Sequence, residues 1–282
     1  MRVGFLGPAG TFSEEALRAS APGEVEEVPY TTVYEAVAAV QSGEADNAVV
    51  PIENSIEGSV TATLDTLVHE APDVWITREV VLPIEHYLVA RRELELEAIE
   101  RVLSHPQGTA QCARFLRERV PAAARVNMSS TAEAVRAVSE SDDAWAAIGS
   151  RFAADLYGCT ILAEGIEDHA HNVTRFVWLA RRDAVAAAPA GEGYKTSIVF
   201  WGFNDNSPGA LQALLGELST RDINLSKIES RPRRVQLGHY MIFLDLDGGA
   251  GDPVVAEGLA ALGRRVEELR LLGSYPAAAA RF

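Results

Sequence analysis

The chain has 282 residues, of which 48% are hydrophobic and 23% are charged, and its formal net charge at pH 7 is −15. This length suffices for two globular domains at roughly 100–200 residues each. The negative charge argues against nucleic acids and anionic membrane surfaces as partners, so an anionic ligand would need a local positive site.

The N-terminus and the cysteines both favour a cytoplasmic protein. The first residues enter a strand pattern directly, without the layout of a signal peptide, and no uncharged apolar run is long enough to cross a bilayer. Cys112 and Cys159 fit no metal motif and are too few for a disulfide framework. We therefore expect no membrane association and two apolar, reduced cysteines.

The region 1–182 alternates strand and helix signals. Two capping boxes, at residues 11–14 and 32–35, each predict the start of a helix, and the second helix is expected to end at Gly43. Strands are expected at residues 3–6, 48–50 and 102–104, and further helices at 60–68 and from about residue 110. This alternation is typical of parallel-type α/β sheets covered by helices on both faces.

An internal repeat suggests that this region contains two similar lobes. Residues 35–40 read Glu-Ala-Val-Ala-Ala-Val, and residues 133–138 read Glu-Ala-Val-Arg-Ala-Val. At the same spacing, a buried strand at 48–51 corresponds to one at 146–149. Clefts between such lobes, at the carboxyl ends of strands, are common ligand sites.

The flexible segment 181–193 predicts a linker to a second domain at 194–282. The order of signals in that domain is strand, helix, strand, strand, helix, strand, as in a ferredoxin-like βαββαβ fold. We expect strands at 195–201, 223–228, 239–246 and 270–275, a helix capped by Ser207 with Pro208 at its first position, and a helix at 253–269.

Three polar turns follow predicted strands in the first region. Residues 7–13, Gly-Pro-Ala-Gly-Thr-Phe-Ser, offer backbone N–H groups and hydroxyls to an anion. Residues 51–58, Pro-Ile-Glu-Asn-Ser-Ile-Glu-Gly, and residues 104–112, beginning Ser-His-Pro-Gln, repeat the layout of strand, polar turn and helix. A plain capped turn or a solvated loop would be the alternative interpretation of each.

The tripeptide Thr174-Arg175-Phe176 places a hydroxyl, a cation and an aromatic ring in an apolar stretch. An unpaired buried arginine would cost several kcal/mol, so Arg175 must either form a structural ion pair or face a pocket that receives an anion. The polar turns favour the pocket.

Several kinds of chemistry have no support in the sequence. No acyl-transfer triad, carboxylate dyad or metal-ligand spacing is evident, and we expect neither a metal nor a cofactor. The glycines at 4, 7 and 10 do not form the dinucleotide fingerprint, which disfavours a Rossmann oxidoreductase.

Through these four segments the chain resembles prephenate dehydratases over nearly its whole length. Residues 208–211, Pro-Gly-Ala-Leu, and 229–232, Glu-Ser-Arg-Pro, resemble an ACT regulatory domain. The resemblance implies a two-lobed catalytic domain with a periplasmic-binding-protein-like fold, followed by the ferredoxin-like ACT domain, in a monofunctional enzyme.

The implied reaction is loss of water and CO2 from prephenate to give phenylpyruvate, a step toward L-phenylalanine. It needs no cofactor because aromatisation supplies the driving force. The resemblance assigns catalysis to Thr174, Arg175 and Phe176, with Thr174 providing a proton to the leaving hydroxyl and Phe176 either packing on the substrate ring or holding Arg175. The expected substrate-binding residues are Gly10, Thr11, Ser13, Asn54, Ser55, Glu57, His105 and Gln107.

The ACT resemblance implies feedback control by L-phenylalanine, bound between paired domains of a homodimer or homotetramer. The expected allosteric residues are Asn204, Asp205, Gly209, Ala210, Leu211, Glu229, Ser230, Arg231 and Pro232. A structural interface is the alternative role for these residues. Alternative functions are arogenate dehydration and non-catalytic sensing of an aromatic acid.

Overall fold

The computed structural model describes residues 1–185, 189–191, 193–204 and 207–278 of the chain. Its first unit, lobe 1, is a sheet in the order β2-β1-β3-β11-β5, with the short strand β4 paired to β3. Its elements are β1 (Arg2–Leu6), α1 (Phe12–Ser20), β2 (Glu26–Tyr30), α2 (Val33–Ser42), β3 (Asn47–Asn54), β4 (Gly58–Ser59), α3 (Thr61–His69), β5 (Val74–Pro83) and β11 (Val173–Arg181).

Helices cover both faces of this sheet, as the alternating sequence pattern predicts. Leu17 of α1 packs with Val3 and Phe5 on one face, whereas α2 and α3 bury Val37 and Leu64 against the other. Both predicted helix starts are confirmed: the hydroxyl of Thr11 accepts from the Glu14 amide, and that of Thr32 from the Glu35 amide. The two glutamates accept from the amides of Gly10 and Thr31, one residue before each cap.

Lobe 2 is a sheet in the order β10-β6-β9-β7-β8. Its elements are β6 (Tyr87–Ala90), a 3₁₀ turn η1 (Leu96–Ala98), β7 (Arg101–Ser104), α4 (Pro106–Gln111), α5 (Ala113–Arg119), β8 (Ala124–Asn127), α6 (Thr131–Ser139), β9 (Trp145–Gly149), α7 (Arg151–Tyr157) and β10 (Thr160–Ala163). The helix expected from about residue 110 begins earlier, at Pro106, because His105 caps it by accepting from the Gln107 amide.

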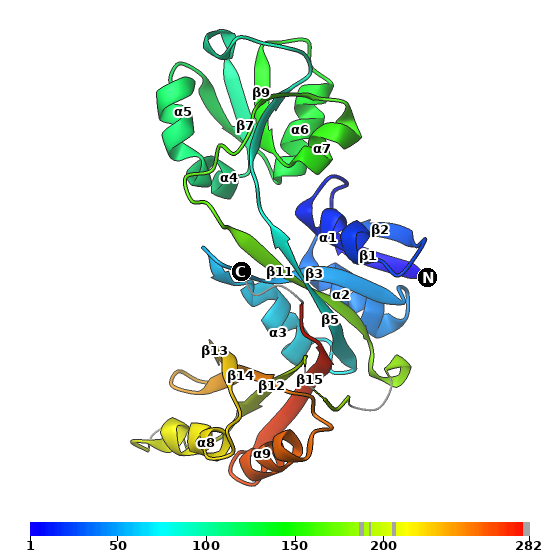
Figure 1. The fold of residues 1–282 in the computed structure, drawn as a ribbon, viewed down its shortest axis with the longest axis vertical. Coiled ribbons are helices and arrows are strands. Elements are labelled where there is room, and N and C mark those ends of the chain that lie inside the picture. Colours follow the sequence, from blue (N-terminus) through cyan, green and yellow to red (C-terminus); the bar gives the residue numbers. More distant parts are fainter. Residues whose placement is uncertain (186–188, 192, 205–206, 279–282) are drawn as a thin grey trace.

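The two lobes repeat one topology, as the internal repeat indicates. In lobe 1 the strand β1 lies parallel to both β2 and β3, and in lobe 2 the strand β7 lies parallel to both β8 and β9. The repeated segments form α2 and α6, followed by β3 and β9. Two segments connect the lobes, after β5 and before β11, and they are joined by a hydrogen bond of 2.8 Å from the Ile84 amide to the carbonyl of Asn172 (Figure 1).

The C-terminal domain is an antiparallel sheet in the order β13-β14-β12-β15 with two helices on one face, which confirms the ferredoxin-like fold. A 3₁₀ turn, η2 (Arg182–Ala184), precedes it. Its elements are β12 (Tyr194–Trp201), α8 (Ala210–Ser219), β13 (Leu225–Pro232), β14 (Tyr240–Asp247), α9 (Pro253–Gly263) and β15 (Glu268–Pro276). The domain limits at 182 and 194 stay a prediction, and residues 186–188 and 192 of the expected linker lie outside the described residues.

Two boundaries expected in this domain are wrong. Helix α8 is capped by Gly209 rather than by Ser207, because Ser207 and Pro208 form a turn in which the Ala210 amide donates to the Ser207 carbonyl. The helix expected over 253–269 ends at Gly263, and β15 already begins at Glu268, where pairing with β12 overrides the helical pattern.

The helix-free face of the C-terminal sheet packs on lobe 1 (Figure 1). Trp201, Phe243 and Leu272 from this sheet share one hydrophobic core with Leu67 of α3 and Ile76 of β5. Burial of apolar area is the main stabilising force in such a contact. The C-terminal domain is therefore packed against lobe 1 rather than only tethered to it.

We predict that Gly273→Ala destabilises this interface. A Cβ added to Gly273 in β15 would lie 2.2 Å from the carbonyl oxygen of Ile76 in β5. Because backbone cannot yield as a flexible side chain does, we expect a loss of about 1–3 kcal/mol in unfolding free energy, measured by chemical denaturation. The control is Gly216→Ala in α8, where an added Cβ meets nothing within 4 Å and should be neutral or stabilising. Equal stability of both variants would contradict the prediction.

Candidate active site

A cleft of about 920 Å³ lies between lobe 1 and lobe 2. Its lining includes seven of the residues expected at the site from the sequence. They are Thr11, Ser13, Asn54, His105, Gln107, Thr174 and Phe176. Each of the turns 7–13, 51–58 and 104–112 contributes, because each follows the carboxyl end of a strand that points toward the other lobe.

Asn54 and Thr174 form the best-defined polar contact in the cleft. They are register partners on β3 and β11, and Nδ2 of Asn54 donates to Oγ1 of Thr174 at 2.9 Å. The orientation of the Asn54 amide is determined by its surroundings, since its Oδ1 accepts from the backbone amides of Ile56 and Glu57, both at 2.9 Å. Oγ1 of Thr174 must therefore act as an acceptor, and its hydroxyl hydrogen is available to a ligand.

A chain of amides continues from Asn54 across the cleft wall. Nδ2 of Asn54 also donates to Oδ1 of Asn172 at 2.8 Å, and Nδ2 of Asn172 donates to Oε1 of Gln111 at 3.4 Å. Nε2 of His86 lies 2.9 Å from the same Gln111 oxygen. Because that oxygen is an acceptor, the proton of His86 is on Nε2. Sequence reasoning missed His86, Gln111 and Asn172, although Gln111 lies within the quoted turn 104–112.

The end of this series of hydrogen bonds, at Gln111 and His86, suits a polar ligand. His86 is 2% exposed, and burial lowers its pKa, so it is neutral near pH 7. Nδ1 of His86 and Nε2 of Gln111 are buried and have no partner among the described residues. Buried polar atoms without partners cost about 1–3 kcal/mol each, which is common where a ligand completes the site.

The positive groups of the cleft are helix N-termini and Arg136, and its lining also contains the carboxylate of Glu133. The N-termini of α1 and α6, capped by Thr11 and Ser130, open toward it. Such termini present free N–H groups and carry partial positive charge. Arg136 of α6 lines the cleft, and its ion pair with Glu140 is long, at 3.8 Å. Arg136 was not among the residues expected from the sequence.

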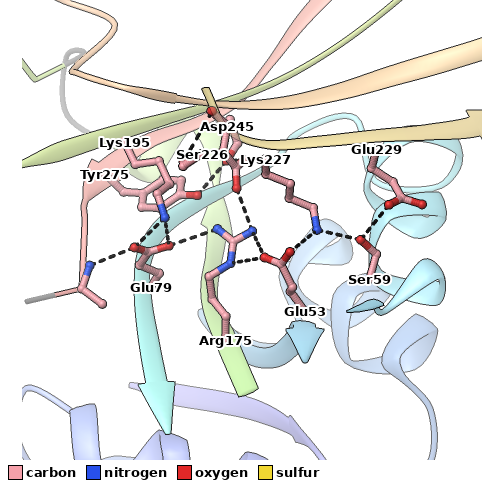
Figure 2. Close-up of polar contacts among 12 residues, drawn as sticks. Glu53, Ser59, Glu79, Arg175, Lys195, Ser226, Lys227, Glu229, Asp245 and Tyr275 are labelled. Carbon is pink, nitrogen blue, oxygen red and sulfur yellow. Dashed lines mark hydrogen bonds and ion pairs between the residues drawn. The ribbon is translucent and has the colours of Figure 1, made fainter. Parts of the chain in front are cut away.

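Arg175 does not face the cleft, and the prediction that it would receive an anion there is wrong. Strand alternation turns it to the opposite face of β11 from Thr174 and Phe176. There it pairs with Glu53 at 3.0 Å, Glu79 at 3.1 Å and Asp245 at 2.7 Å. Figure 2 shows its guanidinium among these three carboxylates, directed at the C-terminal domain.

The electrostatics of Arg175 are those of a structural ion pair. Burial disfavours its charged form, but Asp245, Glu53 and Glu79 offset this and raise its pKa above the ordinary value. Arg175 is therefore permanently charged and held by ion pairs with protein carboxylates, although its Nη2 lies within ion-pair distance of Glu53 and Asp245 without hydrogen-bond geometry. The alternative of a structural ion pair, noted at the level of sequence, is the one that the structure contains.

Three expected substrate-binding residues lie outside the cleft lining. Gly10, with φ of +87°, packs close to Tyr157 and Ala153 of lobe 2 and donates its amide to Glu14 at 2.6 Å. Ser55 connects to β11 instead, because its hydroxyl accepts from the Val173 amide at 3.0 Å. Glu57 is exposed. Local hydrogen bonds direct Gly10 and Ser55 away from the cleft, and substrate binding by these three residues stays a prediction.

The expected allosteric residues fall into two groups. Asn204, Gly209, Ala210 and Leu211 lie in or next to the turn before α8, and Asp205 lies outside the described residues. Along β13, Glu229 and Arg231 alternate with the exposed Ser230 and Pro232. The hydroxyl of Ser59 donates to Glu229 at 3.1 Å, and Arg231 pairs with Asp65 at 2.7 Å, so both side chains face lobe 1.

Two further observations concern the described part of the chain. It contains no group of three or more His, Cys, Asp or Glu side chains arranged to hold a metal ion. Its helices include none with the length and hydropathy needed to cross a membrane.

The fold and the cleft thus define a two-lobed α/β ligand-binding region with a ferredoxin-like domain packed against it. The family model for prephenate dehydratase matches residues 3–184. A prephenate dehydratase of Mycobacteroides abscessus is 41% identical over 98% of this chain and 90% of its own length. The chain therefore belongs to the prephenate dehydratase family, which confirms the resemblance seen in the sequence.

Solved structures agree on the fold. The prephenate dehydratase of Arthrobacter aurescens, determined in complex with L-Phe, has a TM-score of 0.88 and 42% identity, covering 99% of this chain and 93% of that one. A protein described as GqqA, a quorum quenching acylase, has a TM-score of 0.87 and 31% identity over 99% of both chains.

We predict that Arg136→Met raises the KM for a dianionic substrate about 10- to 150-fold with little change in kcat, because charge-assisted hydrogen bonds contribute roughly 1.5–3 kcal/mol. Steady-state kinetics on prephenate measure this. The control is Arg117→Met, an exposed helix arginine outside the cleft with a similarly long ion pair of 3.9 Å to Glu118. Equal KM values for the two variants would show that Arg136 does not bind the substrate.

Proposed function

We propose that the protein converts prephenate to phenylpyruvate, CO2 and water. The observation that carries this proposal is the Asn54–Thr174 contact in a cleft between lobes, which presents a hydroxyl hydrogen to a bound ligand. Membership of the prephenate dehydratase family supports the same reaction.

The reaction suits a site of this kind because its bond changes need only one proton. The bond to the ring carboxylate breaks, its electron pair completes the aromatic ring, and the ring C–O bond breaks with its own pair. The departing oxygen takes a proton and leaves as water. Aromatisation drives the process, so the protein must bind two carboxylates, exclude water and supply hydrogen-bond donors.

In this scheme Thr174 donates to the departing oxygen. Threonine is a weak acid, so its developing negative charge needs stabilisation, and the Nδ2 donor of Asn54 is already in contact with Oγ1. Preorganised donors of this kind are among the largest contributions to catalysis. Phe176 lines the same cleft beside the reacting ring, while Arg136 and the N-termini of α1 and α6 offset the carboxylates.

L-phenylalanine is proposed as the effector of this chain, because the Arthrobacter aurescens relative was determined in complex with it. The proposed sites are the turn before α8 and the exposed positions of β13, at the interface of a homodimer or homotetramer.

Arogenate, which has an amino group in place of the keto group of prephenate, is the alternative substrate. Non-catalytic sensing of an aromatic acid is the alternative function from a different class.

Acyl hydrolysis is a second candidate function because of the structural similarity to the quorum quenching acylase. Such chemistry usually needs a hydroxyl or thiol activated by a base. Among the described cleft residues, His86 instead contacts Gln111, and Nδ1 of His105 accepts from the Gln107 amide. Neither histidine is hydrogen-bonded to a nucleophile, which favours the dehydratase.

The direct test follows phenylpyruvate formation from prephenate, with arogenate as the comparison substrate and L-phenylalanine added in a parallel series. Turnover of prephenate that falls on addition of L-phenylalanine is the expected result. Calorimetry with L-phenylalanine, together with the solution mass with and without it, tests effector binding and assembly. An inactive protein that binds prephenate would favour the sensor, and faster turnover of arogenate would change the substrate.

We predict that Thr174→Ser retains activity and that Thr174→Val lowers kcat about 10²- to 10⁴-fold, the typical contribution of general acid catalysis. The valine keeps the shape of the side chain and removes the hydroxyl. Thr77→Val is the control, since the Thr77 hydroxyl donates to the Trp178 carbonyl in the same sheet and does not line the cleft. Near-normal turnover by Thr174→Val would exclude Thr174 as the donor.

A further inference from the structure

A buried group of charges lies between lobe 1 and the C-terminal domain. We call it the interdomain ion cluster. Lobe 1 supplies Glu53, Glu79 and Arg175, and the C-terminal domain supplies Lys195, Lys227 and Asp245 (Figure 2).

Ion pairs of the cluster connect lobe 1 to the C-terminal domain at three places. Lys195 pairs with Glu79 at 2.9 Å, Lys227 pairs with Glu53 at 2.9 Å, and Asp245 pairs with Arg175 at 2.7 Å. Most of the side chains are well buried, with exposed fractions of 3% for Glu79 and 7% for both Asp245 and Lys227. The formal charges of the six groups cancel, as burial requires.

The cluster is connected to the reacting groups through two adjacent register pairs. Thr174 lies opposite Asn54, and Arg175 lies opposite Glu53, on the paired strands β11 and β3. Because side chains alternate along a strand, one pair faces the cleft and the next faces the C-terminal domain. A shift of Arg175 or Glu53 therefore moves the backbone that carries Thr174 or Asn54.

Strand β13, which bears the expected effector residues 229–232, contacts lobe 1 beside the interdomain ion cluster. The Ser59 hydroxyl, in the strand β4 that follows the Asn54 loop, donates to Glu229 of β13 at 3.1 Å and accepts from Lys227 at 2.6 Å. Asp245 in turn accepts from the Ser197 hydroxyl of β12 at 2.6 Å. Movement of β13 or of the C-terminal sheet thus acts directly on Glu53 and Arg175, the cluster residues that neighbour Asn54 and Thr174 in the chain.

We propose that the interdomain ion cluster couples the C-terminal domain to catalysis, with Arg175 and Glu53 acting as positioning residues for Thr174 and Asn54. This inference rests on the proposed function and gives Arg175 a role other than substrate binding. Effector binding that displaces β13 or β14 changes the ion pairs of the cluster and, through them, the contact between Asn54 and Thr174.

The test uses Asp245→Asn and Lys227→Met in the full chain. Asparagine keeps the shape of Asp245 and removes its charge, and methionine keeps most of the length of Lys227. We expect kcat to change at least fivefold with KM within twofold, because the variants disturb positioning rather than binding. We also expect inhibition by L-phenylalanine to weaken at least fivefold while its calorimetric affinity in the absence of substrate stays within twofold, since coupling between sites is typically worth 5- to 150-fold.

The matched control is Glu217→Gln, a carboxylate of the C-terminal domain that pairs with Arg265 at 2.6 Å and makes no ion pair or hydrogen bond with the described residues of lobe 1. Ser59→Ala is the mildest variant and carries the same test if a charge change prevents folding. Kinetics and L-phenylalanine response at wild-type level in folded Asp245→Asn and Lys227→Met would overturn the proposal, as would the same changes in Glu217→Gln.

Different results would contradict the coupling through the interdomain ion cluster and the proposed prephenate dehydratase activity. Wild-type protein without prephenate turnover would contradict the function alone. The coupling is then measured by hydrogen exchange at the amides of residues 52–56 and 173–176, which Asp245→Asn should accelerate at least fivefold relative to Glu217→Gln. Equal exchange in the two variants would overturn the coupling.

Discussion

The pairing of β3 with β11 is the constraint on which the site depends. These strands are far apart in the sequence, and β11 enters the sheet only after the chain has completed lobe 2. Their antiparallel register places Thr174 opposite Asn54. The Thr174 hydroxyl therefore obtains its partner through a strand pairing that spans the whole of lobe 2 in the sequence, and the same register places Arg175 opposite Glu53 on the other face.

On the face of β11 opposite Thr174 lies the buried cation Arg175, whose charge has to be neutralised. Arg175 lies in a region of low dielectric, where an unpaired guanidinium would cost several kcal/mol. Lobe 1 supplies two carboxylates for one arginine, and the C-terminal domain supplies two lysines and one carboxylate. In this cluster lobe 1 carries one negative charge in excess and the C-terminal domain carries one positive charge in excess, so each side neutralises the other. This complementarity, together with the shared hydrophobic core around Trp201 and Ile76, explains why the domains form a packed contact.

Local signals predicted much of the fold and part of the cleft lining. Thr11, Asn54 and Gln107 lie at or shortly after strand ends, and strand ends of parallel sheets meet at one edge. Arg136 was missed because an arginine in the second turn of an amphipathic helix reads as a surface residue. Asn172 was missed because its contact with Asn54 joins segments that are distant in the chain.

Arg175 was assigned to the wrong side for a different reason. Strand alternation alone implies that Thr174 and Arg175 point to opposite faces, so the sequence contained the signal against a shared pocket. Its acidic partners could not be found in the same way, since Glu79 and Asp245 come from separate strands in separate domains. Which carboxylates neutralise a buried arginine is a property of the assembled tertiary structure.

The division of charge between the two faces of β11 has a consequence for the chemistry. Arg175 is held by three carboxylates on the face away from the cleft, whereas Arg136 lines the cleft and, among the described residues, pairs only with Glu140 at 3.8 Å. The cleft itself offers mainly neutral donors, and these are effective where the substrate supplies its own driving force. The ion pairs that join the domains thus lie behind β11 and preorganised donors lie in front of it, although a single peptide bond joins Thr174 to Arg175.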